Sequence, residues 1–302
     1  MSPKNMAASV HARLAETARR TNRPFQELLQ YYGMERFLYR LSKSPQAAPF
    51  VLKGALMLRV WNAPMARPTK DIDLLGRLES PLENLSTVVR EVCAVDVEPD
   101  GLVFTPATVK SERIREDADY ESVRIRFEGL LGRARIAMQL DVGIGDVMVP
   151  GPVEIAYPTL LDFPAPRLKG YPRETAIAEK FEAMVKLGTL NSRMKDFYDI
   201  WILSRQFGFA GPTLAQAVTA TFANRGTTVT AEPVALTTEF SENEVANTQW
   251  RAFVRKGRLA NAPASLGEAV GDIARFLLPV ARAHLAGGNF KMTWTAGGPW
   301  RM

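Results

Sequence analysis

Two acidic residues alternate with apolar ones in a short segment of the first half of the chain. Residues 69–75 read Thr-Lys-Asp-Ile-Asp-Leu-Leu. This pattern predicts a β-strand, because successive strand side chains point to opposite faces of a sheet. Asp71 and Asp73 would then project from one face, while Ile72 and Leu74 enter the core from the other. The segment therefore predicts a sheet that presents two neighbouring carboxylates.

Two carboxylates this close repel each other, and a bound divalent cation with oxygen ligands, such as Mg²⁺ beside phosphates, is the usual reason for both to stay ionised. The alternative is a solvated strand edge, on which charges prevent aggregation. Residues 49–58 favour the metal, since they predict an apolar strand, a turn at Gly54 and the start of a short helix running toward Trp61. Gly54 would let a ligand approach the backbone, and the first helical turn would favour an anion.

Three further stretches of sequence are distinctive in combination. They are Phe50–Ala55, Arg67–Leu74, and Glu179-Lys180 followed by Arg193–Ile200. Together they resemble the nucleotidyltransferase toxins of the AbiEii/AbiGii abortive-infection family, relatives of the MenT toxins, over about residues 35 to 205. The resemblance implies a polymerase-β-like core. One departure is Gly54-Ala55, where the family has Gly-Ser or Gly-Gly, so a hydroxyl that could touch the nucleotide phosphate is absent.

A third carboxylate falls on another predicted strand. In residues 134–142 the apolar residues at even positions share one face and leave Asp141 on the other. Enzymes of the polymerase-β-like superfamily use a third carboxylate from a neighbouring strand as a metal ligand or as the base for the attacking hydroxyl. The resemblance therefore implies this role for Asp141. Asp146 competes for it, but the glycine-rich residues 143–145 before it indicate a turn.

The second half of the chain contributes a lysine and two acids on predicted helices. Lys180 borders an apolar stripe that begins at Glu174, where a lysine usually extends its amine to solvent. The resemblance implies instead that Lys180 contacts nucleotide phosphates, with Lys186 as a weaker candidate. Asp196 and Asp199 are three residues apart on the next helix, where acids also stabilise the helix dipole. The resemblance supports Asp196 as an active-site acid, whereas Asp199 would support helix packing; spacing alone does not separate their roles.

The resemblance assigns roles to a defined set of residues. The catalytic residues would be Asp71, Asp73, Asp141, Lys180 and Asp196; nucleotide contacts would come from Lys53, Gly54, Ala55, Arg67, Lys180 and Asp199; and Asp71, Asp73 and Asp141 would hold Mg²⁺, or Mn²⁺ in its place. The substrate would be an NTP, the acceptor the 3′ end of tRNA, and a cognate antitoxin would restrain the enzyme. Three alternatives remain open: nucleotide transfer to a protein hydroxyl, a nucleotide-binding regulator without turnover, and a DNA-binding or structural partner.

These features predict an α+β fold with two domains. Residues 1–165 would form N-terminal helices and a small mixed-sheet nucleotidyltransferase core, and residues 166–302 a helical domain that completes the active site. Helices are expected at residues 8–21, 35–42, 80–95, 174–188, 234–240, 244–256 and 266–285, and two more are expected to begin at residues 24 and 193. Strands are expected at residues 50–53, 71–75, 103–109, 120–127, 133–142 and 152–157.

The composition excludes several classes of site. Cys93 is the only cysteine, which excludes a disulfide within the chain and a multi-cysteine zinc site. His11 and His284 are the only histidines, so a histidine-based metal site or triad is not expected. The N-terminus lacks the apolar core of a signal peptide, and no apolar run is long enough for a membrane span. We therefore expect a cytoplasmic protein.

Positive charge is concentrated at the two ends of the chain. Residues 1–45 hold eight Lys and Arg against three Glu, and residues 250–302 hold eight against two acids, which gives net charges of +5 and +6. With a total of +6, the stretch between them carries −5. Basic ends beside an acidic middle fit a metal site flanked by phosphate-attracting arms, including a cluster at Arg251, Arg255, Lys256 and Arg258. The alternative is ordinary amphipathic helix surfaces.

Overall fold

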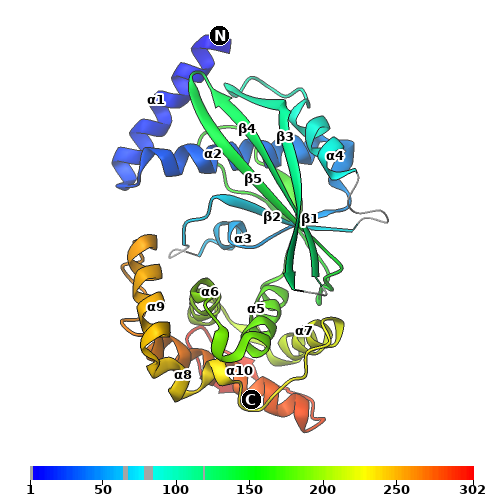
Figure 1. Cartoon of the computed structure of the whole chain (residues 1–302), viewed down its shortest axis with the longest axis vertical. Coiled ribbons are helices and arrows are strands. Elements are labelled where there is room, and N and C mark those ends of the chain that lie inside the picture. The colour runs from blue at the N-terminus through cyan, green and yellow to red at the C-terminus, as the bar shows by residue number, and fades with distance from the viewer. Residues whose placement is uncertain (1–2, 64–66, 78–83, 118–119) are drawn as a thin grey trace. The chain divides into compact units, whose positions relative to one another are not determined.

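The computed structural model consists of two compact units, and it describes residues 3–63, 67–77, 84–117 and 120–302 (Figure 1). Unit 1 comprises residues 1–62, 68–145 and 153–170, and unit 2 comprises residues 63–67, 146–152 and 171–302. The division near residue 170 lies close to the boundary predicted after residue 165. Two short segments, 63–67 and 146–152, belong to unit 2 although they interrupt unit 1 in the sequence.

A mixed seven-stranded sheet forms the centre of unit 1, which confirms the predicted α+β fold with a mixed sheet. Its strands are β1 (Phe50–Lys53), β2 (Asp71–Gly76), β3 (Leu102–Asp117), β4 (Tyr120–Leu131), β5 (Ala134–Ile144), β6 (Val153–Ala156) and β7 (Arg167–Gly170). They follow the order β3-β4-β5-β2-β1-β7-β6, with β2 parallel to β5, β1 parallel to β7 and the other pairs antiparallel. Strand β7 was not among the predicted strands.

Helices α1 (Pro3–Thr21), α2 (Phe25–Lys43), α3 (Leu56–Val60) and α4 (Leu85–Cys93) belong to unit 1, with a 3₁₀ turn at Pro45–Ala47. The rings of Phe37 on α2 and of Phe104 and Phe127 on the sheet pack together, with centroids 4.8 to 5.8 Å apart. Gly33 permits this approach, because a Cβ there would lie 3.1 Å from Ile136 and Met138. These contacts form the core between α2 and the sheet.

Helix α2 is continuous, so the prediction of separate helices within residues 24–42 was wrong. Every residue from 31 to 41 is buried. A helix that is buried on all sides has no polar face, and the periodicity that reveals an amphipathic helix is lost. The expected start of a helix at Ser80 and Pro81 lies outside the described residues; α4 is described from Leu85.

Buried charges connect α2 to the sheet of unit 1. Asp100 accepts hydrogen bonds from Arg36 at 2.9 Å and from Arg40 at 2.8 and 3.1 Å. Burial opposes ionisation of Asp100, yet these hydrogen bonds hold its pKa below the usual value. Glu35 accepts a bond from the Leu160 amide at 2.7 Å, and burial raises the pKa of Glu35 to about 7 despite the nearby guanidinium groups of Arg36 and Arg59.

Unit 2 is helical, with a small sheet near its C-terminal end. It contains α5 (Arg173–Leu187), α6 (Met194–Gln206), α7 (Gly211–Asn224), α8 (Thr238–Glu242), α9 (Glu244–Gly257) and α10 (Leu266–Leu285), 3₁₀ turns at Gly188–Leu190 and Val234–Leu236, and strands β8 (Phe209–Ala210), β9 (Thr293–Trp294) and β10 (Trp300–Arg301). Helix α7 was not predicted, and the single helix expected at 234–240 is divided between a 3₁₀ turn and α8.

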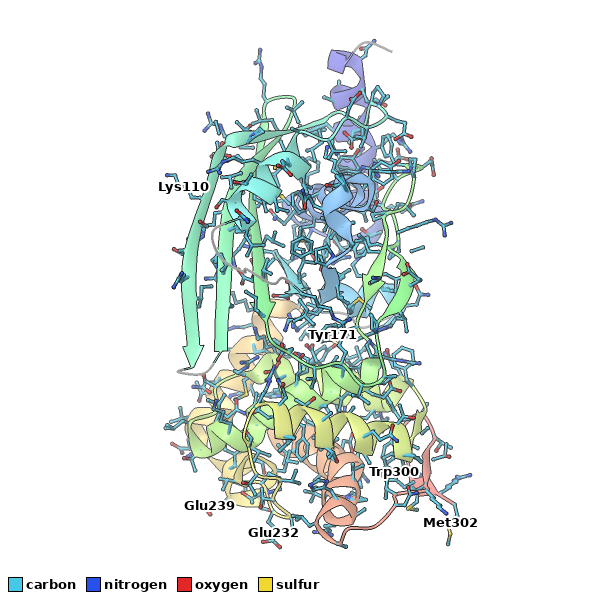
Figure 2. All side chains as sticks on the ribbon, turned by 90° about the vertical axis from the view of Figure 1, so that its right-hand side faces the viewer. Lys110, Tyr171, Glu232, Glu239, Trp300 and Met302 are labelled. Atoms are coloured by element: carbon cyan, nitrogen blue, oxygen red, sulfur yellow. The ribbon has the colours of Figure 1, made fainter. Side chains whose placement is uncertain are left out.

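The aromatic C-terminal tail is anchored within unit 2. The indole nitrogen of Trp294 donates to the Ser204 carbonyl at 2.7 Å, and that of Trp300, labelled in Figure 2, donates to the Phe276 carbonyl at 2.9 Å. Both tryptophans are buried. They therefore serve as intramolecular anchors. Within the described part of the chain, no helix has both the length and the apolar character that a membrane crossing needs.

Glu35→Gln should stabilise the protein more at pH 8 than at pH 5. The fold raises the pKa of Glu35 from 4.5 to about 7, so this carboxyl favours folding when protonated and loses that contribution as the pH rises through 7. Glutamine does not titrate. Urea unfolding should show that the advantage of the variant grows by about 2 kcal/mol between the two pH values. A difference that is constant with pH would contradict this account.

Candidate functional site

The two acids of β2 lie on the face predicted for them. Ile72 and Leu74 are buried at 0% and 1% exposure, while Asp71 and Asp73 are half-buried. The alternation of the strand is thus confirmed. Asp73 is paired in register with Lys53 on β1 and with Asp141 on β5. Since directly paired residues point to the same face of a sheet, one row of unit 1 carries a cation and two carboxylates.

Gly54 brings the backbone against one of these acids. Its φ of +72° lies in the left-handed region, and a Cβ built on it would lie 2.0 Å from Oδ2 of Asp73. The carboxylate therefore contacts the backbone at the turn between β1 and α3, and only glycine fits there. Ala55 is buried at the start of α3, a helix of five residues. The role of Gly54 and Ala55 in nucleotide binding stays a prediction.

Asp141 has a partner that the sequence analysis missed. Arg124 on β4 is paired in register with Asp141, and its Nε and Nη2 each donate to the carboxylate at 2.8 Å. These hydrogen bonds raise the pKa of the Arg124 guanidinium, and the charge of Asp71 adds to the effect. Gln139 donates to the same carboxylate at 3.3 Å. The alternating pattern of β4 placed Arg124 on this face, but only the register of the sheet identifies its partner.

The oxygen donors of β2 fit a hard divalent cation. Mg²⁺ is commonly held by one or two carboxylates, with substrate phosphates and water completing its shell, and Asp71 and Asp73 supply two carboxylates on one face. Among the described residues, no three or more acidic, histidine or cysteine side chains converge as a metal centre would require. The assignment of Asp141 as a third ligand stays a prediction, since its carboxylate is engaged by Arg124.

Lys180, Asp196 and Asp199 come together in unit 2. The Lys180 amine on α5 lies 2.8 Å from Oδ1 of Asp196 and 2.9 Å from Oδ2 of Asp199, both on α6. Arg67 donates to both oxygens of Asp199 at 2.8 and 3.0 Å, and Arg193 donates to Asp196 at 2.6 Å. The two carboxylates are each 1% exposed. Arg193 is a member of this network that the sequence analysis did not identify.

The network keeps its buried groups charged. Burial alone would favour neutral Lys180, but the charges of Asp196 and Asp199 raise its pKa above the usual value. Burial likewise opposes ionisation of the two acids. The charges of Lys180 and Arg193 nevertheless hold the pKa of Asp196 low, and those of Arg67 and Lys180 hold the pKa of Asp199 low. A lysine held as an ammonium is suited to neutralise phosphate charge. Its contact with a nucleotide, and the roles of Asp196, Asp199 and Arg67, stay predictions.

The competing candidates have other partners. Asp146, in unit 2, accepts from Arg225 at 2.8 Å, and the same guanidinium donates to Glu182 at 2.9 Å. Burial favours the neutral form of Arg225, but the neighbouring acids raise its pKa. Asp146 thus belongs to a buried ion-pair network on α5 and α7. Lys186 is exposed in the last turn of α5.

Lys180→Met should destabilise the protein by about 3–5 kcal/mol, because it leaves two buried carboxylates without their shared ammonium. Lys291→Met, at an exposed lysine elsewhere in unit 2, should change stability by less than about 0.5 kcal/mol. Since the pKa values of Asp196 and Asp199 are lowered in the fold, the loss should be complete above about pH 4 and shrink below it. Equal stabilities of the two variants in urea unfolding would contradict the geometry.

Comparison with known proteins identifies the family. The model of the nucleotidyl transferase AbiEii toxin family, of type IV toxin–antitoxin systems, matches residues 36–273. No curated protein matches the chain. Among solved structures, JHP933 from Helicobacter pylori is 16% identical with a TM-score of 0.48, over 87% of this chain and 96% of that one. A second H. pylori structure, provisionally described as a nucleotidyltransferase, is also 16% identical with a TM-score of 0.45, over 85% and 93%.

The two structural likenesses are too weak to carry an argument about function. The family match extends over most of the chain, and it includes the Asp71-x-Asp73 strand of unit 1 as well as Lys180, Asp196 and Asp199 of unit 2. It also agrees with the resemblance found from the sequence. The chain therefore belongs to the AbiEii family of nucleotidyltransferase toxins.

Proposed function

We propose that the protein transfers a nucleoside monophosphate from an NTP to the 3′ end of tRNA in a metal-dependent reaction at Asp71 and Asp73. The observation that carries this proposal is the pair of carboxylates on one face of β2, one of them against the backbone of Gly54. Membership of a type IV toxin–antitoxin family implies a nucleotide substrate and a cognate antitoxin. The tRNA acceptor and the metal go beyond what membership of the family implies.

Asp71 and Asp73 would hold the cation through their carboxylate oxygens. When bound, Mg²⁺ supplies charge neutralisation for the triphosphate and activation of the acceptor hydroxyl. Mn²⁺ has similar ligand preferences and is a second candidate. The chain's own contribution is orientation: Gly54 leaves room for the Asp73 carboxylate, and β5 presents Asp141 in register beside it.

Other residues of unit 1 would manage the charge of the nucleotide. Lys53 is in register with Asp73 and half-buried on the same row, so its amine would neutralise phosphate charge as the leaving group departs. Arg124 donates to both oxygens of Asp141 and would fix the orientation of this carboxylate, whose role as a third acid is part of the proposal. Backbone amides at Gly54 and Ala55 would serve where related sequences have a hydroxyl.

The proposal also includes the network of unit 2. Lys180 would contact nucleotide phosphates, Asp196 would orient Lys180, and Arg67 and Asp199 would contribute to nucleotide binding. The raised pKa of Lys180 supports this assignment, because the ammonium persists throughout the physiological pH range. Arg193 adds a second cation on Asp196.

Asp71→Ala/Asp73→Ala should reduce nucleotide transfer by at least about 1,000-fold, because the metal loses its protein ligands. Purified protein would be incubated with each α-labelled NTP, tRNA and lysate proteins, and label followed in RNA and in polypeptide. Asp162→Ala removes a 99%-exposed acid of unit 1 and should retain full activity. In cells, the double variant should abolish both growth arrest and the lengthening of tRNA 3′ ends.

Each outcome of this experiment is informative. Label in polypeptide instead of RNA would support nucleotidyltransferase activity but contradict the proposal that the acceptor is RNA. Transfer that persists in Asp71→Ala/Asp73→Ala would reject the metal site. NTP binding without pyrophosphate release for any acceptor would favour the alternative that the protein is a nucleotide-binding regulator without turnover.

Gly54→Ala should lower kcat by about 100-fold or more, since its Cβ would collide with Oδ2 of Asp73 and displace the carboxylate. Gly226→Ala is a matched control: Gly226 has a similar left-handed φ of +62°, but a Cβ there would meet nothing within 4 Å. Both variants should lose about 1 kcal/mol of stability from backbone strain. Equal kcat values for the two variants would contradict the proposal that the space at Gly54 positions the Asp73 carboxylate.

A further inference from the structure

We propose that the C-terminal end of α9 is a phosphate-binding surface that docks the body of the RNA acceptor. This surface, the α9 patch, consists of Arg251, Arg255, Lys256 and Arg258. The proposal rests on the proposed function in one respect, that the acceptor is RNA.

The α9 patch is exposed and its charge is uncompensated. All four side chains belong to exposed residues, and the sequence contains no acidic residue from 245 to 267. Over the described ranges of the chain, none of the four forms an ion pair; the hydrogen bond from Arg251 to the hydroxyl of Thr248, at 3.1 Å, is a neutral contact. Four cations thus lie within eight residues, about 10 Å of chain at the helical rise per residue. Such a density complements a polyphosphate backbone.

Packing fixes which side of α9 faces solvent. Trp250 is 1% exposed, and its indole nitrogen donates to the Pro263 carbonyl at 3.2 Å. The ring of Phe253 lies 5.9 Å from that of Trp250 and 5.8 Å from that of Tyr198 on α6. With these aromatic residues turned inward, Arg251 and Arg255, four residues apart, share the outer side. The helix therefore presents the α9 patch from a side opposite its packed aromatic residues.

The backbone at the end of α9 gives an independent indication. Arg258 has a φ of +51°, in the left-handed region, at the position after the helix where glycine is usual. The Leu259 amide donates to the Val254 carbonyl at 3.1 Å and the Arg258 amide to the Arg255 carbonyl at 3.2 Å, which closes the turn. Leu259 is buried and folds back beside Gly257. The turn thus holds Arg258 outward in a strained conformation that its own packing does not explain.

The other non-glycine residues with positive φ in the described chain are Asn22 and Asn62, and asparagine tolerates this region better than arginine does. Strained backbone tends to persist where function requires it. A cation held at this position is consistent with such a requirement.

Helix-dipole stabilisation is the competing explanation. It accounts for Arg255 and Lys256, which lie in the last turn of α9. It does not account for Arg251, which lies nearly two turns from the helix end, or for Arg258, where glycine would cap the helix without strain. The four residues also supply half of the eight basic residues in the strongly positive stretch 250–302. A polyanion-binding surface explains all four positions.

Equilibrium binding of tRNA to the full-length protein tests the proposal, measured by fluorescence anisotropy with Mg²⁺ and without NTP, over a range of salt concentrations. Arg251→Gln/Arg255→Gln/Lys256→Gln/Arg258→Gly should raise Kd at least 10-fold and reduce the slope of log K against log salt by about 3. Lys291→Gln/Arg301→Gln, which removes two exposed cations elsewhere in unit 2, should change Kd less than 2-fold. An unchanged Kd and salt slope in the fourfold variant would overturn the proposal.

Arg258→Gly alone separates binding from folding. Glycine relieves the left-handed strain, so the Tm of this variant should equal or exceed that of the wild type while its Kd for tRNA rises about 2- to 5-fold. A lower Tm together with unchanged binding would assign Arg258 a purely structural role and count against the proposal.

A transfer assay distinguishes this proposal from the proposed function. The fourfold variant should transfer nucleotides at the wild-type rate to a short oligonucleotide with a tRNA 3′ end, but show an increased KM for whole tRNA. Equal KM values of the fourfold variant and the wild type for whole tRNA would overturn the proposed role of the α9 patch. The proposed nucleotide transfer would be unaffected by that result. Absence of transfer to any RNA by the wild type, with tRNA binding still sensitive to the patch, would overturn the proposed function alone.

Discussion

The contact between the Asp73 carboxylate and the backbone of Gly54 is the constraint on which the rest of unit 1 depends. Gly54 turns the chain out of β1 with a left-handed φ, and the absence of a side chain leaves the space that Oδ2 of Asp73 occupies. One residue thus satisfies both a conformational and a steric requirement. Because Asp73 is also in register with Asp141, the position of this turn is linked to that of the neighbouring carboxylate and its partner Arg124.

Each unit contains buried ionic groups, and these differ from surface ion pairs in the free-energy cost of removing their charges from water. Removing Asp100 from water is costly, and its several hydrogen bonds from Arg36 and Arg40 offset that cost. Lys180 and its two acids in unit 2 are arranged in the same way. Such networks are weak sources of stability but strong constraints on geometry. In unit 2 the constraint holds the Lys180 ammonium charged and in one place.

The sequence revealed the parts of this protein that depend on local pattern. The alternation around Asp71 predicted the buried and exposed faces of β2, and the helical periodicity placed α10 at its observed bounds. Features set by contacts between distant segments were missed. Arg124 is one of several charged residues on β4, and its pairing with Asp141 depends on a register that no local pattern encodes. The continuity of α2 was missed because complete burial removed its periodicity.

The networks of unit 2 show the same limit more clearly. Arg67 and Asp199 are separated by 132 residues, yet they form a two-bond ion pair. Resemblance to a family selected Lys180 and Asp196, but it gave no reason to add Arg193, since arginine before a helix is common and its partner lies on the following turn. Asp146 is a further case: the turn expected at residues 143–145 is reduced to a bend at Gly145, because residues 143 and 144 continue β5, and the partner of Asp146, Arg225, is 79 residues away.

Two left-handed backbone positions show opposite solutions to the same steric problem. At Gly54 the chain uses the residue without a side chain, because any Cβ would collide with Asp73. At Arg258, which is exposed, glycine would be favoured on conformational grounds, yet a long cationic side chain is present. Glycine at position 54 leaves room for the Asp73 carboxylate. Arginine at position 258 projects a guanidinium group into solvent. Local stability explains glycine at position 54 but not arginine at position 258. Binding of a polyanionic ligand explains the arginine at the end of α9.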